Sequence, residues 1–124
     1  MNSQVELPTK PASTQRSPRY LFLAEFRATD TISGMRIEGL TADLSEGGCC
    51  VMARRAPFSA GTLIRLEIKK DGDSLQTEAT VIYNLKDQIL GVQFGEMSGP
   101  RQALLAKWIN AARAGRRSAK SVSE

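Results

Sequence analysis

Residues 64–83 decide the fold, and they read Ile-Arg-Leu-Glu-Ile-Lys-Lys-Asp-Gly-Asp-Ser-Leu-Gln-Thr-Glu-Ala-Thr-Val-Ile-Tyr. Ile64, Leu66 and Ile68 alternate with charged residues, a pattern typical of a strand that buries one face. The Asp-Gly step that follows predicts a tight hairpin turn. Beyond the turn, one face of the returning strand is expected to carry Leu75, Thr77, Ala79, Val81 and Tyr83. The stretch therefore predicts an antiparallel hairpin with one buried face.

Four further runs outside this hairpin have the alternation of strands. They are residues 20–29, 35–44, 49–53 and 90–94, and Gly39 indicates a bulge or bend in the second of them. Pro57 excludes a central strand from the connection that follows the third run. Together with the hairpin these runs give about six short strands, which favours a small closed or nearly closed β-barrel.

The apolar period becomes helical after the last of these strands. Pro100 suits the first turn of a helix, where its missing N–H costs nothing. The apolar residues then fall at helical spacing, at Leu104, Leu105, Trp108, Ile109 and Ala112. We expect this stripe to pack on the sheet or to plug one end of the barrel. The predicted fold class is mainly β: a small six-stranded antiparallel β-barrel with one C-terminal helix.

A chain of 124 residues is expected to form one domain around one hydrophobic core. Residues 1–14, almost without large apolar groups, are predicted to be a flexible arm. The barrel and helix are assigned to residues 15–112 and residues 113–124 are predicted to be a basic flexible tail, in which the residues from Gly115 onward do not continue the helix. Basic side chains outnumber acidic ones three to one in residues 1–19 and four to one in residues 113–124, whereas residues 20–112 carry ten and eleven. Basic flanks favour phosphate-bearing partners, although solvated tails are often basic for solubility alone.

The composition removes most enzyme and metal-site classes. Histidine, the commonest general base and transition-metal ligand, is absent from the sequence. Paired carboxylates at a defined spacing and a Walker-type phosphate loop are missing too, and adjacent Cys49 and Cys50 form no spaced metal-ligand pair. We therefore expect no enzymatic activity, no metal and no cofactor. The two thiols fit a reducing compartment, and neither a signal peptide nor an apolar stretch of transmembrane length occurs, so a cytoplasmic protein without a membrane span is expected.

The candidate binding site is the turn Asp43-Leu44-Ser45-Glu46-Gly47-Gly48. Its carboxylate, its hydroxyl and a glycine that permits close backbone approach can read the edge of a guanine base. Arg16 and Arg19 precede the turn by some two dozen residues, and guanidinium groups pair with phosphate and with guanine in bidentate geometry. These residues predict a clamp for a cyclic dinucleotide. The alternative from the residues alone is that Asp43 and Ser45 cap a turn and that the arginines are solvated arm residues.

Over residues 15–112 the sequence resembles the PilZ domain family of bacterial cyclic di-GMP receptors. Asp43, Ser45 and Gly48 match the family's Asp/Asn-x-Ser-x-x-Gly turn, and residues 91–94, Gly-Val-Gln-Phe, resemble its Gly-Val-x-Phe strand. Arg19 takes the place of the second arginine of the family's Arg-x-x-x-Arg motif. Gln15 stands where the first arginine belongs, and Arg16 follows it one position late.

This resemblance implies that cyclic di-GMP is the ligand and that the chain is a non-enzymatic sensor. By analogy with the family, Arg16 and Arg19 engage phosphate and guanine, Asp43 and Ser45 contact guanine, and Gly48 permits the turn. Gln15 is a possible contributor through a neutral hydrogen bond, which has roughly half the strength of a charge-assisted one. We expect the ligand to order the N-terminal arm and thereby to signal to an effector protein.

Two other functions compete with the sensor. A degenerate member of the same family would keep the barrel, would not bind the ligand and would act as an adaptor through protein–protein interaction; Gln15 is the feature that favours it. A nucleic-acid binder would use the basic flanks. It is disfavoured because residues 20–112 are close to neutral and their strands carry no evident aromatic platform for stacking bases.

Overall fold

The computed structural model describes residues 18–123 of the chain. Within this range, seven strands precede one helix: β1 (Tyr20–Leu21), β2 (Glu25–Asp30), β3 (Arg36–Leu44), β4 (Gly48–Met52), β5 (Leu63–Lys70), β6 (Asp73–Leu85), β7 (Ile89–Phe94) and α3 (Gly99–Ser123). The predicted arm of residues 1–14, together with Gln15 and Arg16, lies outside the described residues.

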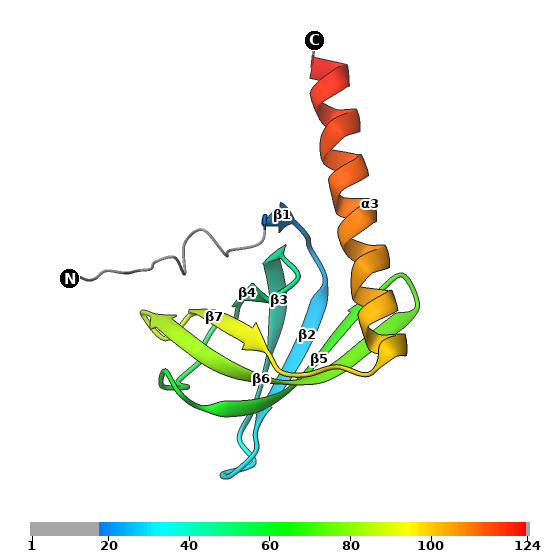
Figure 1. The fold of residues 1–124 in the computed structure, drawn as a ribbon. Coiled ribbons are helices and arrows are strands. Elements are labelled where there is room, and N and C mark those ends of the chain that lie inside the picture. Colours follow the sequence, from blue (N-terminus) through cyan, green and yellow to red (C-terminus); the bar gives the residue numbers. More distant parts are fainter. Residues whose placement is uncertain (1–17, 124) are drawn as a thin grey trace, which may run out of the picture.

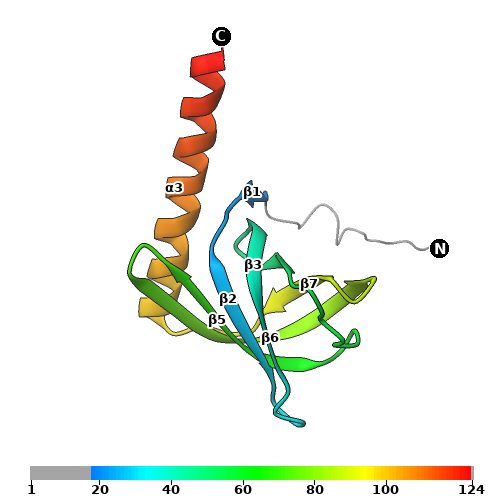
Figure 2. The same ribbon diagram turned by 180° about the vertical axis from the view of Figure 1, so that it is seen from behind.

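The seven strands form one antiparallel sheet in the order β1-β3-β2-β5-β6-β7-β4. An additional pairing of β3 with β4 closes β2 to β7 into a six-stranded barrel and leaves β1 as a short extra strand on β3 (Figure 1). The view from behind shows α3 outside the barrel, next to β1 (Figure 2). This confirms the predicted fold class, an antiparallel six-stranded β-barrel with one C-terminal helix.

The β5–β6 hairpin forms as its sequence predicts. Ile64 pairs with Ala79 and Ile68 with Leu75, and all four side chains are buried. The two residues of the turn, Asp71 and Gly72, both have positive φ, at 54° and 85°. A two-residue turn with this backbone matches the right-handed twist of the strands, so the hairpin fixes its own register.

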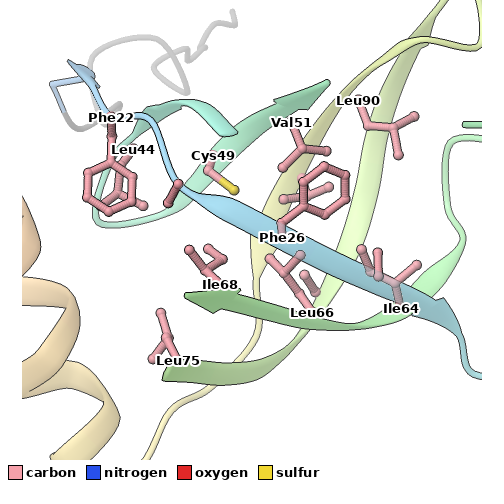
Figure 3. Close-up of a cluster of buried hydrophobic side chains, with 14 of the residues drawn as sticks. Phe22, Phe26, Leu44, Cys49, Val51, Ile64, Leu66, Ile68, Leu75 and Leu90 are labelled. Carbon is pink, nitrogen blue, oxygen red and sulfur yellow. The ribbon is translucent and has the colours of Figure 1, made fainter. Parts of the chain in front are cut away.

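The core fills the barrel with side chains from alternate positions of every long strand (Figure 3). Fully buried members are Leu44, Val51, Ile64, Leu66, Ile68, Leu75, Val81 and Leu90. Burying such a side chain stabilises the fold by about 1.5–3 kcal/mol relative to leaving it exposed. Because these residues repeat at period two, a slip of one position in any strand would turn its apolar side chains out to solvent.

The predicted strand of residues 20–29 is interrupted. β1 ends at Leu21 and β2 begins at Glu25, and the intervening segment carries one residue more than the stretch of β3 opposite it, since Leu21 pairs with Asp43 and Glu25 with Leu40. Thr41, fully buried, bridges the break: its hydroxyl donates to the carbonyl of Phe22 over 2.6 Å and accepts from the N–H of Ala24 over 2.9 Å.

The irregularity predicted at Gly39 is misplaced. Gly39 pairs with Phe26 in regular register, and the shift in β3 lies further along, between Thr41 and Asp43 on the side facing β4. The extra residue of this shift is Ala42, opposite the step from Cys50 to Val51 in β4, and because it is not a glycine the sequence pattern does not reveal the bulge.

Helix α3 packs against β1 and β6 through the stripe that the spacing predicts. Leu105, Trp108 and Ile109 are buried, and the Trp108 ring lies 5.4 Å from that of Phe22, centroid to centroid. The helix then continues through Gly115 to Ser123, so the prediction that residues from Gly115 onward do not continue it is wrong as far as Ser123. A single glycine costs a helix only about 1 kcal/mol, and the alanines around it favour the helix.

We expect Thr41→Val to destabilise the barrel markedly. The substitution keeps the shape of the side chain but leaves a buried carbonyl and a buried N–H without their partner, at a cost of about 1–3 kcal/mol. Thr80→Val is the matched control, because the hydroxyl of Thr80 makes no hydrogen bond within the described part of the chain. Thermal unfolding followed by circular dichroism measures both, and equal melting temperatures would contradict this role of Thr41.

Candidate ligand-binding site

The turn between β3 and β4 is held by Ser45 and Gly48. The Ser45 hydroxyl donates to the carbonyl of Gly48 over 3.1 Å and accepts from its N–H over 3.2 Å, and the Ser45 N–H donates to the same carbonyl over 2.9 Å. Ser45 is buried, and the N–H of Phe94 ties the turn to β7 by donating to the carbonyl of Gly47. In this geometry Ser45 has the turn-stabilising role that the sequence left open.

Gly48 is required by the approach of a neighbouring strand. A Cβ on Gly48 would lie 2.0 Å from the carbonyl oxygen of Val92 in β7, a backbone atom that cannot move away alone. The adjacent Gly47 has no atom within 4 Å of the corresponding position and does not have positive φ. The two neighbouring glycines therefore differ in function, and only the second is fixed by packing.

Asp43 and Arg19 meet although 24 residues separate them. β1 pairs with the end of β3, with Leu21 opposite Asp43, and this register brings the arginine just before β1 alongside the carboxylate. Arg19 Nη1 lies 3.4 Å from Asp43 Oδ2, and the side chains are 42% and 26% exposed. The other oxygen, Oδ1, accepts the backbone N–H of Cys50 over 3.0 Å, which fixes the orientation of the carboxylate.

A row of outward-facing residues continues from Asp43 across the barrel. Cys50 pairs with Asp43 on one side and with Gly91 on the other, and Gly91 pairs with Tyr83. The Tyr83 hydroxyl donates to Cys50 Sγ over 3.9 Å, and its ring covers Gly91, where a Cβ would lie 2.1 Å from a ring carbon. Partial burial and the bond to Cys50 raise the pKa of Tyr83, so the phenol is protonated at neutral pH.

The sequence analysis missed Tyr83 and Cys50 as parts of this surface. Alternation placed Tyr83 on the inner face with Val81, but the register of β6 shifts between these two residues, which brings Tyr83 opposite the outward-facing Gly91. The prediction for Tyr83 is therefore wrong. Gly91 stands between the apolar residues Leu90 and Val92, and a glycine inside a strand is a sequence signal that a bulky side chain of a neighbouring strand packs over its backbone.

An apolar row lies directly beside the polar one on the same four strands. Its members are cross-strand neighbours in continuous register: Leu40, Met52, Ile89 and Leu85. Leu40, Met52 and Leu85 are exposed, and Ile89 is half-buried. The outer face of β3, β4, β7 and β6 thus offers a cation, a carboxylate and a phenol beside an apolar strip, a combination suited to a flat, polar-edged ring system.

Of the predicted site residues, the structure brings together Arg19, Asp43, Ser45 and Gly48, while Gln15 and Arg16 lie outside the described residues. Burial above all raises the pKa of the Cys49 thiol, which holds it neutral. Residues 18–123 contain no group of three or more histidine, cysteine, aspartate or glutamate side chains that could hold a metal ion. The same residues include no helix that is long and apolar enough to cross a membrane.

Comparison with known proteins identifies the fold family. The PilZ domain family model matches residues 13–111, which is most of the chain. The chain belongs to the PilZ domain family. This confirms the resemblance carried by the Asp43 turn and by the Gly-Val-Gln-Phe strand, and the PilZ turn motif is the one that Ser45 and Gly48 stabilise here.

Solved structures share the fold at low sequence identity. The PilZ domain of YcgR from Escherichia coli with c-di-GMP has a TM-score of 0.68 and 17% identity, covering 86% of this chain and 97% of that one. The PilZ domain of CeSA from a cellulose-synthesizing bacterium has a TM-score of 0.62 and 20% identity, covering 81% and 99%. The Bacillus subtilis inhibitor of motility MotI/DgrA has a TM-score of 0.67 and 19% identity, covering 90% and 59%. No curated protein matches the chain.

Gly48→Ala is expected to destabilise the domain while Gly47→Ala is tolerated. The first forces a methyl group onto a backbone carbonyl of β7, and overpacking of this kind costs about 1–3 kcal/mol. The second adds a methyl group to open space. Chemical denaturation of the two variants measures the difference in free energy of unfolding. A Gly48→Ala variant as stable as Gly47→Ala would show that the close contact with Val92 is not a constraint.

Proposed function

We propose that this chain is a non-enzymatic c-di-GMP receptor domain that binds its ligand at Arg19, Asp43 and the Ser45–Gly48 turn. The observation that carries the proposal is the pairing of Arg19 with Asp43 on the outer face of a PilZ barrel. Two of the solved structures that share the fold, both of YcgR, contain c-di-GMP according to their descriptions, which supports the choice of ligand.

Arg19 and Asp43 can each exchange the other for a group of a bound nucleotide. It is long and partly exposed, and surface pairs of this kind contribute only about 0–1 kcal/mol. A guanidinium can bind a phosphate through two parallel hydrogen bonds, whereas Arg19 makes a single bond of 3.4 Å to Asp43. The carboxylate, once released, can accept hydrogen bonds from the N–H groups on the edge of guanine, so one molecule carrying both groups satisfies both side chains.

The proposed signal runs from the ligand to a partner protein through the residues that precede β1. Arg19 stands at the junction of those residues with the barrel, and Arg16 and Gln15 supply the remaining polar contacts in the proposal. A doubly anionic ligand draws the basic N-terminal residues onto the barrel and creates a surface for an effector protein. The ordering of these residues reduces the apparent affinity of the ligand.

A second function, a PilZ adaptor that acts by protein–protein interaction without ligand, is favoured by one feature of the sequence. Gln15 occupies the position of the first arginine of the family's arm motif, which removes one of two cations from the expected clamp. Isothermal titration of the full chain with c-di-GMP separates the two functions: saturable heat supports the receptor, and no heat at high micromolar ligand supports the adaptor.

Arg19→Ala is expected to weaken binding of c-di-GMP by roughly 10- to 100-fold, because a hydrogen bond to a charged group contributes about 1.5–3 kcal/mol. Arg27→Ala is the matched control: Arg27 is also an exposed arginine paired with a carboxylate, but its partners are Glu38 and Glu67. Isothermal titration gives the dissociation constants. Equal constants for the two variants would remove Arg19 from the site.

Gln15→Arg is expected to tighten binding by up to roughly tenfold, because it replaces a neutral hydrogen-bond donor with a charged one at the four-residue spacing from Arg19. Gln4→Arg adds the same charge at a distant position and serves as the control for general electrostatic attraction. The same titration at two salt concentrations measures both. An equal gain in both variants would mean that net charge, not the motif spacing, limits the affinity.

A further inference from the structure

The segment from Arg19 to Ala24 joins the candidate ligand site to helix α3. At its start, Arg19 pairs with Asp43 on the outer face of the barrel. Three residues later Phe22 is buried, and its ring lies 5.4 Å from that of Trp108 in the helix, at an angle of 37°. Arg19 is therefore only three positions along the chain from the side chain that contacts the helix.

Phe22 contacts both the helix and the end of β5. Trp108, itself only 4% exposed, makes the ring contact described above, and the ammonium group of Lys70 lies 5.4 Å from the centre of the Phe22 ring. Lys70 Nζ also donates to the carbonyl of Leu23 over 2.7 Å. The ring thus connects the end of β5 with the helix, and it cannot move without changing the surroundings of Trp108.

The segment departs from the regular geometry of a strand. It is the break between β1 and β2, with one residue more than the strand opposite. The break is held by the side chain of Thr41 and by two backbone bonds, a 3.2 Å bond from the N–H of Phe22 to the carbonyl of Ala42 and a 2.8 Å bond from the N–H of Thr41 to the carbonyl of Ala24, and these do not form a continuous ladder. Such a bulge can change its backbone angles while the strands on either side keep their register.

Helix α3 has room to respond. Between it and the β3–β4 turn lies a cavity of about 370 Å³, lined by Glu46 from the turn and by one face of the helix: Gln102, Leu105, Ala106, Ile109, Asn110 and Arg113. The helix is therefore packed closely at Trp108, where it meets Phe22, and loosely toward the turn that carries the other half of the candidate site. Figures 1 and 2 show the helix next to β1 and continuing past the barrel.

We propose that α3 is the output element of this domain, and that the contact between Phe22 and Trp108 transmits ligand binding to it. Exchange of Arg19 from Asp43 to a phosphate moves the segment from Arg19 to Ala24, and Phe22 carries that movement to the helix. The ligand selects the helix position that fits the moved segment. The inference rests on the proposed function, since it takes c-di-GMP as the ligand.

The test uses Trp108, the only tryptophan of the chain, as a reporter. The full-length protein is titrated with c-di-GMP while tryptophan fluorescence and heat of binding are recorded in parallel. We expect the emission of Trp108 to change and to saturate at the same ligand concentration as the heat. Phe22→Leu should keep the dissociation constant within a factor of two to three of the wild type but lose at least half of the fluorescence change.

Phe58→Leu is the matched control, since Phe58 is also a buried phenylalanine but has no ring contact to Trp108 in the described chain. It should keep the full fluorescence change. Hydrogen–deuterium exchange of residues 104–112 in the wild type gives a second measurement that needs no variant, and it should change when c-di-GMP is added.

Saturable heat with unchanged Trp108 emission and unchanged exchange of residues 104–112 would overturn the inference and leave the receptor function intact. A Phe22→Leu variant with the full fluorescence change would overturn the role of Phe22. The absence of heat in the wild type would instead overturn the receptor function, and this inference with it.

Discussion

The pairing of β3 with neighbours on both edges is the constraint on which the rest of the structure depends. One edge pairs with β1 and β2, and the other closes the barrel by pairing with β4. Asp43 lies where both pairings meet, opposite Leu21 on one side and Cys50 on the other. The position of its carboxylate is therefore set by barrel closure, and the arginine before β1 is brought to it by the same ladder. Loss of the β1–β3 pairing would separate the two charges, and loss of the β3–β4 pairing would remove the Cys50 N–H that orients the carboxylate.

Two irregularities turn this regular barrel into one with a candidate site. In β6, the shift after Val81 directs Tyr83 to the outer face, above Gly91. Between β1 and β2, the additional residue lets Arg19 reach the outer face while Phe22 enters the core. Each irregularity leaves backbone groups outside the ladder, and a buried group without a partner costs about 1–3 kcal/mol. Thr41 meets this need at the second break, which explains a buried hydroxyl in an apolar interior.

The sequence predicts the parts of this molecule that repeat and misses those that interrupt the repeat. The alternation around Ile64 and Leu66 and the Asp-Gly turn are local signals, so the barrel, its hairpin and the helical stripe around Trp108 could be predicted. The break at Phe22 and the outward turn of Tyr83 depend on which residues lie opposite, and no single strand contains that information. The end of α3 was misjudged because Gly115 and small polar residues are also typical of tails.

For the candidate site, the family motif identifies the residue types, and the structure shows which of them stabilise the turn and which are available to a ligand. The Ser45 hydroxyl is hydrogen-bonded within the turn, and the backbone of Val92 leaves no space for a side chain at Gly48, so both residues set the shape of the turn. Arg19 and Asp43 are the exposed groups, and each holds the other in the free protein.

That mutual pairing also bears on selectivity in the proposed receptor. A simple phosphate that takes Arg19 leaves the carboxylate of Asp43 without its cation and next to a second anion, which is unfavourable. A ligand that carries hydrogen-bond donors as well as a phosphate can pair its phosphate with Arg19 and donate a hydrogen bond to the Asp43 oxygen that Arg19 has left. Because Oδ1 stays bound to the N–H of Cys50, the free oxygen keeps a fixed direction, and only a donor held at the matching distance from the phosphate can reach it. The ion pair of the free protein thus disfavours ligands that carry charge alone and favours those in which phosphate and base edge belong to one molecule.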